Sequence, residues 1–220
     1  MLRLSLDAKA RVNIGLFDRG GKNRITVETN DHDFNPKTTL TPYGIFIPEF
    51  DELFLYLTTS TVTSDFIVDI LEDFWESEKS RFEKIKTLII NQDNGSENNS
   101  RRTQFMKRIV EFSQKYQVNI RLAYYPPYHS KYNPIERTWA VLENHWKGSI
   151  LDEIETALKF AQTMTWKGKH PIVKLITETY EKGVKLTKKA MEKIERLTES
   201  TNQDFPDLGQ WFIDIYYDKT

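Results

Sequence analysis

The sequence of 220 residues contains no cysteine and only four histidines. Without cysteine the chain cannot form disulfide bonds, thiolate zinc sites or a cysteine nucleophile, and four scattered histidines speak against a histidine-rich metal site. A metal ion bound to this protein would therefore be held by carboxylate oxygens. Such ligands favour hard cations such as magnesium or manganese.

Long apolar runs are also missing. No stretch approaches the length of a membrane-spanning helix, and residues 1–15 lack the sustained apolar segment of a signal peptide. We therefore expect a soluble intracellular protein with no membrane partner. The formal net charge of −1 speaks against a protein that coats polyanions in general. A group of catalytic acids would, however, lower the total charge of a chain with a local nucleic-acid site.

Glycine-rich phosphate loops are absent as well. Neither GxxxxGK[ST] nor GxGxxG occurs in the chain, so the sequence offers no cradle for a free nucleotide. If this protein acts on a phosphate, we expect that phosphate to belong to a polynucleotide.

Apolar residues are plentiful enough for a buried core, at 39% hydrophobic and 13% aromatic. The length fits one large domain, or one domain with an appendage. Short apolar runs, period-two alternation and helical spacing predict the elements: strands at 2–8, 12–16, 44–47 and 52–57, a helix from 63, a strand at 86–93, a helix at 101–116, a strand at 120–125 and a helix from 134. This order predicts an α/β domain with a mixed central sheet flanked by helices.

Two expectations concern the first strands. Residues 2–8 alternate strictly between apolar and polar, and we expect them to form a hairpin with a returning strand at 12–16. Residues 18–42 hold many Gly, Asp, Asn and Thr residues and few apolar anchors, so we expect a long loop there.

The character of the sequence changes after Gly148. The pattern predicts a helix over 151–161, a basic loop at 166–171, a strand at 172–179, a lysine-rich helix at 182–196 and a last strand at 211–217. We therefore divide the chain into a core at 1–148 and a C-terminal α+β extension at 149–220 that packs on it.

Three acidic residues fall where this fold would place chemistry. Asp7 and Asp93 lie at the carboxyl ends of predicted strands, and Glu136 lies in the first turn of a predicted helix. Open α/β sheets bind ligands in the crevice at the carboxyl ends of their strands. Each acid also has a structural interpretation: a turn residue for Asp7, an Asp-Asn-Gly turn for Asp93, and a capping box with Asn133 for Glu136.

The helix around Glu136 favours the chemical interpretation. Its apolar stripe must face the sheet and consists of Ile135, Trp139, Leu142 and Trp146. Glu136 lies one residue further round the helix, about 100° from the stripe, so it looks along the seam between helix and sheet. We therefore expect Asn133 to cap the helix alone and Glu136 to point into the site.

Three carboxylates close together raise one another's pKa unless a cation balances them. Two divalent cations about 3.5–4 Å apart would remove that conflict and form the two-metal arrangement of phosphoryl transfer. The residues around Glu136 mix aromatic rings with basic groups, as in a surface that stacks on bases and binds phosphate. A well-packed surface loop is the structural alternative for these residues.

Three stretches resemble the acidic motifs of DDE transposases: Asp7 in SLDAKARVNIG, Asp93 in INQDNGSEN and Glu136 in YPPYHSKYNPIERTW. The likeness is closest to the bacterial insertion-sequence members of the mariner-like group, and TPYGIFIPEFDELFLYLTTS and TWKGKHP are similar to one branch of that group. The resemblance implies a ribonuclease-H-like fold, with Asp7, Asp93 and Glu136 as catalytic residues that bind two Mg2+ or Mn2+ ions. It also implies cleavage of DNA at transposon ends, strand transfer, a homo-oligomer assembled on DNA, and a place in the bacterial cytoplasm at the nucleoid.

Two features depart from that pattern. Such transposases carry an N-terminal helix-turn-helix region that recognises the transposon ends, whereas this chain begins at the first predicted catalytic strand. We therefore expect either a trimmed catalytic domain or a truncated gene product. Asn94 and Glu97 also stand where the family has small residues.

The hypothesis from the sequence is a metal-dependent DDE transposase catalytic domain. Further candidates for positioning DNA are Asn98, His129, Lys131 and Arg137. Two alternatives stay open: another ribonuclease-H-like nuclease, and a catalytically silent remnant that only binds DNA.

Overall fold

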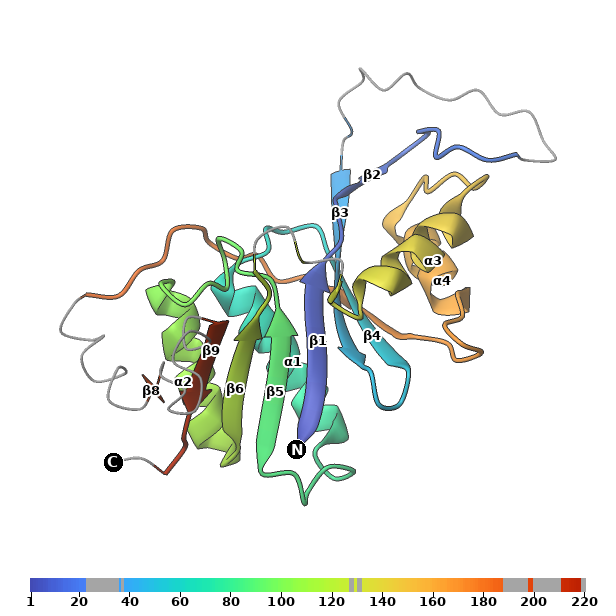
Figure 1. Ribbon diagram of the computed structural model, residues 1–220. Helices are drawn as coiled ribbons and strands as arrows, with labels where there is room; N and C mark the ends of the chain where they lie inside the picture. The colour runs from blue at the N-terminus through green and yellow to red at the C-terminus, as the bar shows by residue number, and fades with distance from the viewer. Residues whose placement is uncertain are drawn as a thin grey trace.

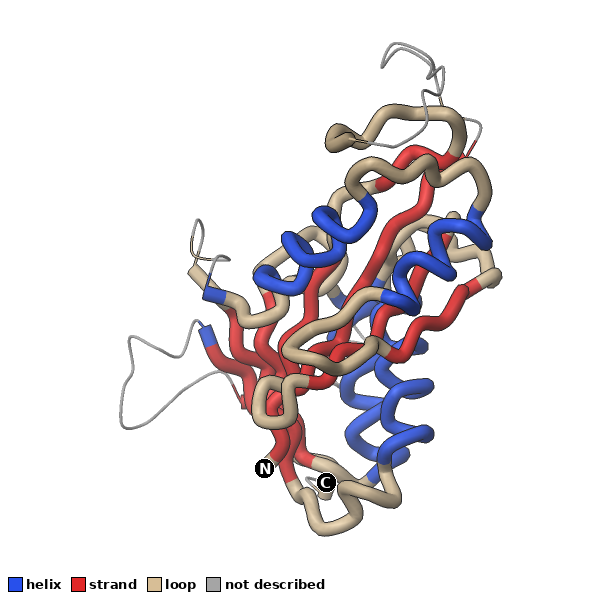
Figure 2. Tube along the Cα trace, turned by 90° about the vertical axis from the view of Figure 1, so that its right-hand side faces the viewer, coloured by secondary structure: helices blue, strands red, loops and turns tan. Residues whose placement is uncertain are grey.

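The structure is a computed structural model that describes residues 1–22, 36, 38–126, 129, 132–187, 198–199 and 211–218. Its strands are β1 (Leu2–Ala8), β2 (Val12–Ile14), β3 (Thr38–Ile47), β4 (Glu52–Thr58), β5 (Thr87–Gln92), β6 (Asn119–Tyr124), β7 (Ile172–Ile176), β8 (Thr198–Glu199) and β9 (Phe212–Ile215). Its helices are α1 (Ser64–Glu78), α2 (Thr103–Tyr116), α3 (Glu136–Trp146) and α4 (Ile154–Thr163). Within these residues the strands form one sheet in the order β7-β4-β3-β1-β5-β6-β9-β8, with β2 paired to β3, and helices lie on both sides of it (Figures 1 and 2).

Strand β1 lies in the middle of the sheet. It pairs antiparallel with β3 and parallel with β5, and β5 pairs parallel with β6. The carboxyl ends of β1, β5 and β6 therefore meet at one edge of the sheet, which is the upper edge in Figure 1. The predicted mixed sheet flanked by helices is confirmed.

Alternation along the strands divides the apolar side chains between two cores. Leu2, Leu4 and Leu6 of β1 join α1 and α2 in one buried cluster. Helices α3 and α4 pack on the opposite face, against β3, β4 and β7. Because successive side chains of a strand point to opposite faces, Ser5 and Asp7 lie on the side of α3.

The predicted hairpin between the first two strands is wrong. Strand β2 pairs with β3, from Val12 opposite Leu40 to Ile14 opposite Thr38, and β1 pairs with the other half of the same long strand. Residues 38–42 therefore belong to a strand and not to the predicted loop. Pro42 lies at the gap between β1 and β2, where only its carbonyl is needed, and that carbonyl accepts the Lys9 N–H at 2.9 Å.

The C-terminal predictions are confirmed in part. Helix α4 and strands β7 and β9 lie where the pattern predicted them, and β7 and β9 extend the sheet beside β4 and β6. Residues 182–187 of the predicted lysine-rich helix are not helical, and residues 188–196 lie outside the described part of the chain. In the part that the structure describes, no helix is long and apolar enough to cross a membrane.

Candidate active site

Asp7 lies near the carboxyl end of β1 and is partly buried. The indole Nε1 of Trp139, on α3, donates a hydrogen bond of 2.7 Å to Asp7 Oδ2. In the neighbouring strand, Gly44 of β3 is the residue paired with Asp7. The Asp7 side chain of β1 is thus hydrogen-bonded directly to α3.

Gly44 is what allows α3 to come so close. A Cβ atom at this position would stand 2.5 Å from Ile135 Cδ1 and 2.9 Å from Trp139 Cη2, which is well inside van der Waals contact. The absence of a side chain on β3 therefore makes room for the apolar stripe of α3, and the Trp139 ring can reach Asp7.

The start of α3 differs from the predicted cap. Asn133 does not cap the helix, which begins at Glu136 without a side-chain cap. Its Nδ2 donates to the Leu6 carbonyl at 3.0 Å, and its Oδ1 accepts a short hydrogen bond from Ser5 Oγ. The prediction was wrong because Asn133 is buried against β1, where the strand offers its amide both a donor and an acceptor.

Asp93 follows β5, at the same edge of the sheet. Its side chain is exposed, but hydrogen bonds hold the loop that carries it in place. Asn98 Nδ2 donates to Gln92 Oε1 at 3.1 Å, and Tyr124 Oη donates to the Asn98 carbonyl at 2.8 Å. Ser64 at the start of α1 adds a hydrogen bond of 2.6 Å to the carbonyl of Glu97.

The charges of Glu136 and Asp93 both act on Asp7. Burial raises the pKa of Asp7 to about 7; the Trp139 hydrogen bond opposes that rise, and the negative charges of Glu136 and Asp93 add to it. The protein around Asp93 also desolvates that carboxylate and raises its pKa, against the Asn98 amide and together with the charge of Glu97. A nearby cation would oppose the rise in the pKa of both carboxyl groups.

The donor set fits a hard divalent cation, since all three side chains offer carboxylate oxygens and the region has an excess of negative charge. Within the described residues, no three acidic or histidine side chains already stand as ligands around one point. The fit rests on the kind of donor and on the negative charges of Glu136 and Asp93 that act on Asp7.

The DNA-positioning candidates have different surroundings. Asn98 is buried and bonded to Gln92, which argues against a direct contact with DNA. His129 and Arg137 are exposed, and the His129 ring stacks on that of Tyr132 with centroids 5.9 Å apart. Lys131 lies outside the described residues.

The sequence patterns missed two residues of this region. They place Trp139 in the apolar stripe alone, and Ser5 on the polar face of the first strand. The N–H of a buried tryptophan usually has an acceptor, and that signal could have directed attention to an acid across the helix–sheet seam. No comparable signal marks Ser5.

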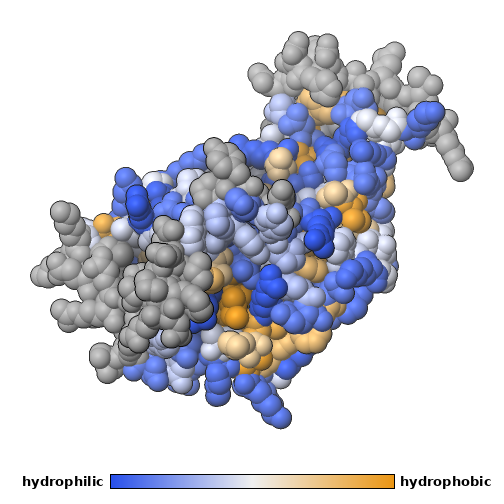
Figure 3. Space-filling model, in the orientation of Figure 1, coloured by the Kyte–Doolittle hydropathy of each residue, from blue (hydrophilic) through white to orange (hydrophobic). Residues whose placement is uncertain are grey.

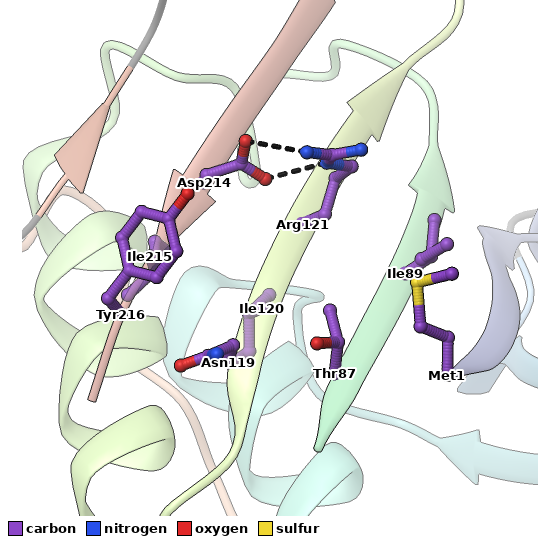
Figure 4. A pocket seen from close by; sticks show the side chains of 9 residues that line it. All are labelled: Met1, Thr87, Ile89, Asn119, Ile120, Arg121, Asp214, Ile215 and Tyr216. Carbon is purple, nitrogen blue, oxygen red and sulfur yellow. Dashed lines mark hydrogen bonds and ion pairs between the residues drawn. The ribbon is translucent and has the colours of Figure 1, made fainter. Parts of the chain in front are cut away.

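A separate hollow lies at the opposite end of the strands. It is lined by residues of β5, β6 and β9 together with Met1 and Tyr216 (Figure 4), and a two-pronged ion pair joins Arg121 to Asp214 there, at 2.6 and 2.9 Å. The visible face of the molecule is mainly hydrophilic around small apolar spots (Figure 3). Asp7 and Asp93 lie at the carboxyl ends of β1 and β5, so this hollow is not part of their site.

Comparisons with known proteins bear on the family and the fold of the chain. The family model described as Rhodopirellula transposase DDE domain matches residues 2–216. Two solved structures are similar in fold: the Mos1 transposase paired-end complex with left transposon end, at 10% identity, and the Mos1 mariner paired-end complex with Mn, at 12% identity, both with a TM-score of 0.54. Each match covers 72% of this chain and 46% of the Mos1 chain. No curated protein matches the sequence. The predicted ribonuclease-H-like fold is confirmed.

Proposed function

The chain belongs to the Rhodopirellula transposase DDE domain family, and we propose that it is a transposase catalytic domain that cleaves DNA at transposon ends and transfers the cut strand to a target. The observation that carries the proposal is the position of three acids from distant parts of the chain: Asp7 near the end of β1, Asp93 directly after the parallel strand β5, and Glu136 at the start of α3, whose Trp139 is hydrogen-bonded to Asp7. The charges of Glu136 and Asp93 both raise the pKa of Asp7. Such coupling at the edge of a ribonuclease-H-like sheet suits phosphoryl transfer.

Asp7, Asp93 and Glu136 are the proposed catalytic residues and would hold Mg2+ or Mn2+, as two ions. Bound ions of this kind activate an attacking oxygen and stabilise a leaving oxygen. Trp139 donates its indole N–H to the Asp7 carboxylate. The hydrogen bonds of Gln92, Asn98 and Tyr124 hold the loop that carries Asp93.

We propose that His129, Lys131 and Arg137 contact DNA beside the acids. The exposed His129–Tyr132 ring pair offers a flat surface to a base, and Arg137 follows Glu136 directly on α3, where it can meet a phosphate. Residues 1–148 are the proposed catalytic core and 149–220 the extension. Assembly into a homo-oligomer on DNA, in the bacterial cytoplasm at the nucleoid, belongs to the same proposal.

The test is cleavage of supercoiled plasmid by the purified chain in Mn2+, Mg2+ or EDTA, with joining of a labelled oligonucleotide as the second readout. We expect metal-dependent nicking and joining by the parent, and a loss of at least a hundredfold in Asp93→Asn. The exposed Asp152, between α3 and α4, provides the matched control, Asp152→Asn, which should behave as the parent.

The outcomes separate the alternatives. Nicking without any joined product would favour another ribonuclease-H-like nuclease. DNA binding with neither nicking nor saturable Mn2+ binding would identify a silent remnant. Equal nicking by Asp93→Asn and the parent would refute the assignment of the acids.

A further inference from the structure

Hydrogen bonds that involve side chains join β1 to α3 and to the residues just before it. They are separate from the backbone hydrogen bonds of the sheet and of the helix. Three successive residues of β1, namely Ser5, Leu6 and Asp7, form hydrogen bonds with α3 or with the residues just before it. Ser5 Oγ donates to Asn133 Oδ1 and accepts the Ile135 N–H at 3.1 Å. The Leu6 carbonyl accepts from Asn133 Nδ2.

These contacts occupy the place where the sheet opens. The pairing of β1 with β5 ends at Ser5 and Asn91, whereas its pairing with β3 continues to Ala8. Asn133 bonds to β1 just beyond the end of the β5 pairing. Ser5 and Asn133 are 0% and 1% exposed, so breaking either contact would leave a buried polar group without a partner.

The contact of the third residue, Asp7, involves the acid itself. Trp139 lies about one turn beyond Glu136 on α3 and is 7% exposed. Its indole Nε1–H donates a hydrogen bond of 2.7 Å to Asp7 Oδ2. Its ring is held against β3 at the position of Gly44. Glu136 thus lies between two fixed points, the Asn133 contact before it and the Trp139 contact after it.

We propose that Trp139, supported by Ser5 and Asn133, is a positioning residue that sets the orientation of the Asp7 carboxylate and its spacing from Glu136 for cation binding. This inference rests on the proposed function. A hydrogen-bond donor behind a ligating carboxylate typically contributes ten- to a hundredfold to metal affinity. One donor on one oxygen stops the rotation of the carboxylate while the remaining lone pairs stay available to an ion.

The chain offers a matched control for this test. Trp146 lies on the same helix and in the same apolar stripe, is fully buried, and its Nε1 has no hydrogen-bond partner in the described part of the chain. Replacement of either tryptophan by phenylalanine removes an indole N–H and leaves an aromatic ring. Only Trp139→Phe removes a hydrogen bond to an acid.

The experiment is calorimetric titration of Mn2+ into the purified chain without DNA, for the parent, Asp7→Asn, Trp139→Phe and Trp146→Phe, with thermal unfolding in EDTA for each. We expect Asp7→Asn to abolish saturable binding and Trp139→Phe to weaken it about tenfold or more. Trp146→Phe should keep the parental affinity. Weakening in both tryptophan variants alike, or a fall in affinity explained by unfolding in EDTA, would assign Trp139 to packing alone and overturn the inference.

The same titration separates the inference from the proposed function. If the parent binds Mn2+ through Asp7 and Trp139→Phe binds equally well, the positioning role is refuted and the proposed function stands. If the parent shows no saturable binding, or Asp7→Asn binds as the parent does, both are refuted.

Discussion

At the scale of single residues, the proposed site depends on Asp7, whose surroundings disfavour the ionised form of its carboxyl group. Asp7 is turned towards α3, partly buried, and coupled to two other acids, and its pKa is raised from 3.8 to about 7. Between about pH 4 and pH 7, therefore, Asp7 is mainly neutral in the folded chain without metal and mainly ionised in the unfolded chain. The charge that catalysis would use is a cost to the stability of the metal-free fold.

A prediction about pH follows from the sign of this shift. Because the folded pKa lies above the unfolded one, the metal-free fold loses stability as pH rises from about 4 to about 7. Asp7→Asn removes the charge, so in EDTA at pH 8 this variant should be more stable than the parent, by roughly 1–4 kcal/mol at 1.36 kcal/mol per pKa unit. The difference should shrink by more than half at pH 5.

Urea unfolding at the two pH values measures this difference, with Asp152→Asn as the exposed control. A parent that is more stable than Asp7→Asn at pH 8 in EDTA would show that the Asp7 carboxylate is not strained in the metal-free fold.

At the scale of elements, the distance between α3 and β3 is set by one missing side chain. Gly44 faces the apolar stripe of the helix, and the Ile135 and Trp139 side chains occupy the space that its Cβ would take.

The basic segment at 166–171 also has a structural role. Lys167 and Lys169 form ion pairs with Asp51 and Glu52 and so fasten the turn between β3 and β4.

Gly44→Ala should push α3 away from the sheet. We expect a loss of roughly 1–3 kcal/mol in the free energy of unfolding, as for overpacked cores, and weaker Mn2+ binding because Trp139 moves with the helix. Ile135→Val deletes the Cδ1 atom nearest to the new methyl group. In a double-mutant cycle it should therefore recover part of that loss.

Denaturant unfolding and Mn2+ titration of the four proteins in the cycle measure both effects. Strict additivity of the two substitutions would contradict a direct clash between position 44 and Ile135.

At the scale of the whole molecule, the proposed cations would join parts of the chain that are otherwise linked only through the sheet. Asp7 belongs to β1, Asp93 follows β5, and Glu136 begins α3. An ion held by all three binds the folded chain and not the unfolded one. Metal binding should therefore stabilise the fold by mass action.

Mn2+ at a hundred times its dissociation constant should add about 2.7 kcal/mol of stability. For a chain of this length that corresponds to a rise of roughly 5–10 °C in Tm. Glu136→Gln should lose most of this rise, because an amide is a weaker ligand than a carboxylate and carries no charge.

Differential scanning calorimetry with and without Mn2+ measures the rise, and Glu155→Gln, on α4, is the control for the substitution itself. An equal rise in Glu136→Gln and the parent would place the bound ion elsewhere.

The sequence by itself determined the order of most elements, the location of Asp7 and Asp93 at strand ends, and the location of Glu136 near the start of a helix. Alternation in β1, the apolar run of β5 and the stripe of α3 are local patterns, and local patterns survive without knowledge of the partner strands. The motif around Glu136 is equally local. For this reason the sequence alone allows Asp7, Asp93 and Glu136 to be proposed as the catalytic acids.

Only the tertiary structure decided which elements meet. The pairing of β2 with β3, the capture of Asn133 by Ser5 and Leu6, and the bond from Trp139 to Asp7 each join residues that are far apart in the sequence. The Asn133 side-chain amide can either cap the helix that follows it or bond to β1. The sequence shows only the first of these partners, because it is the one nearby in the chain. Burial of Asn133 against β1 settled that competition, because a buried amide takes the partners that its surroundings provide.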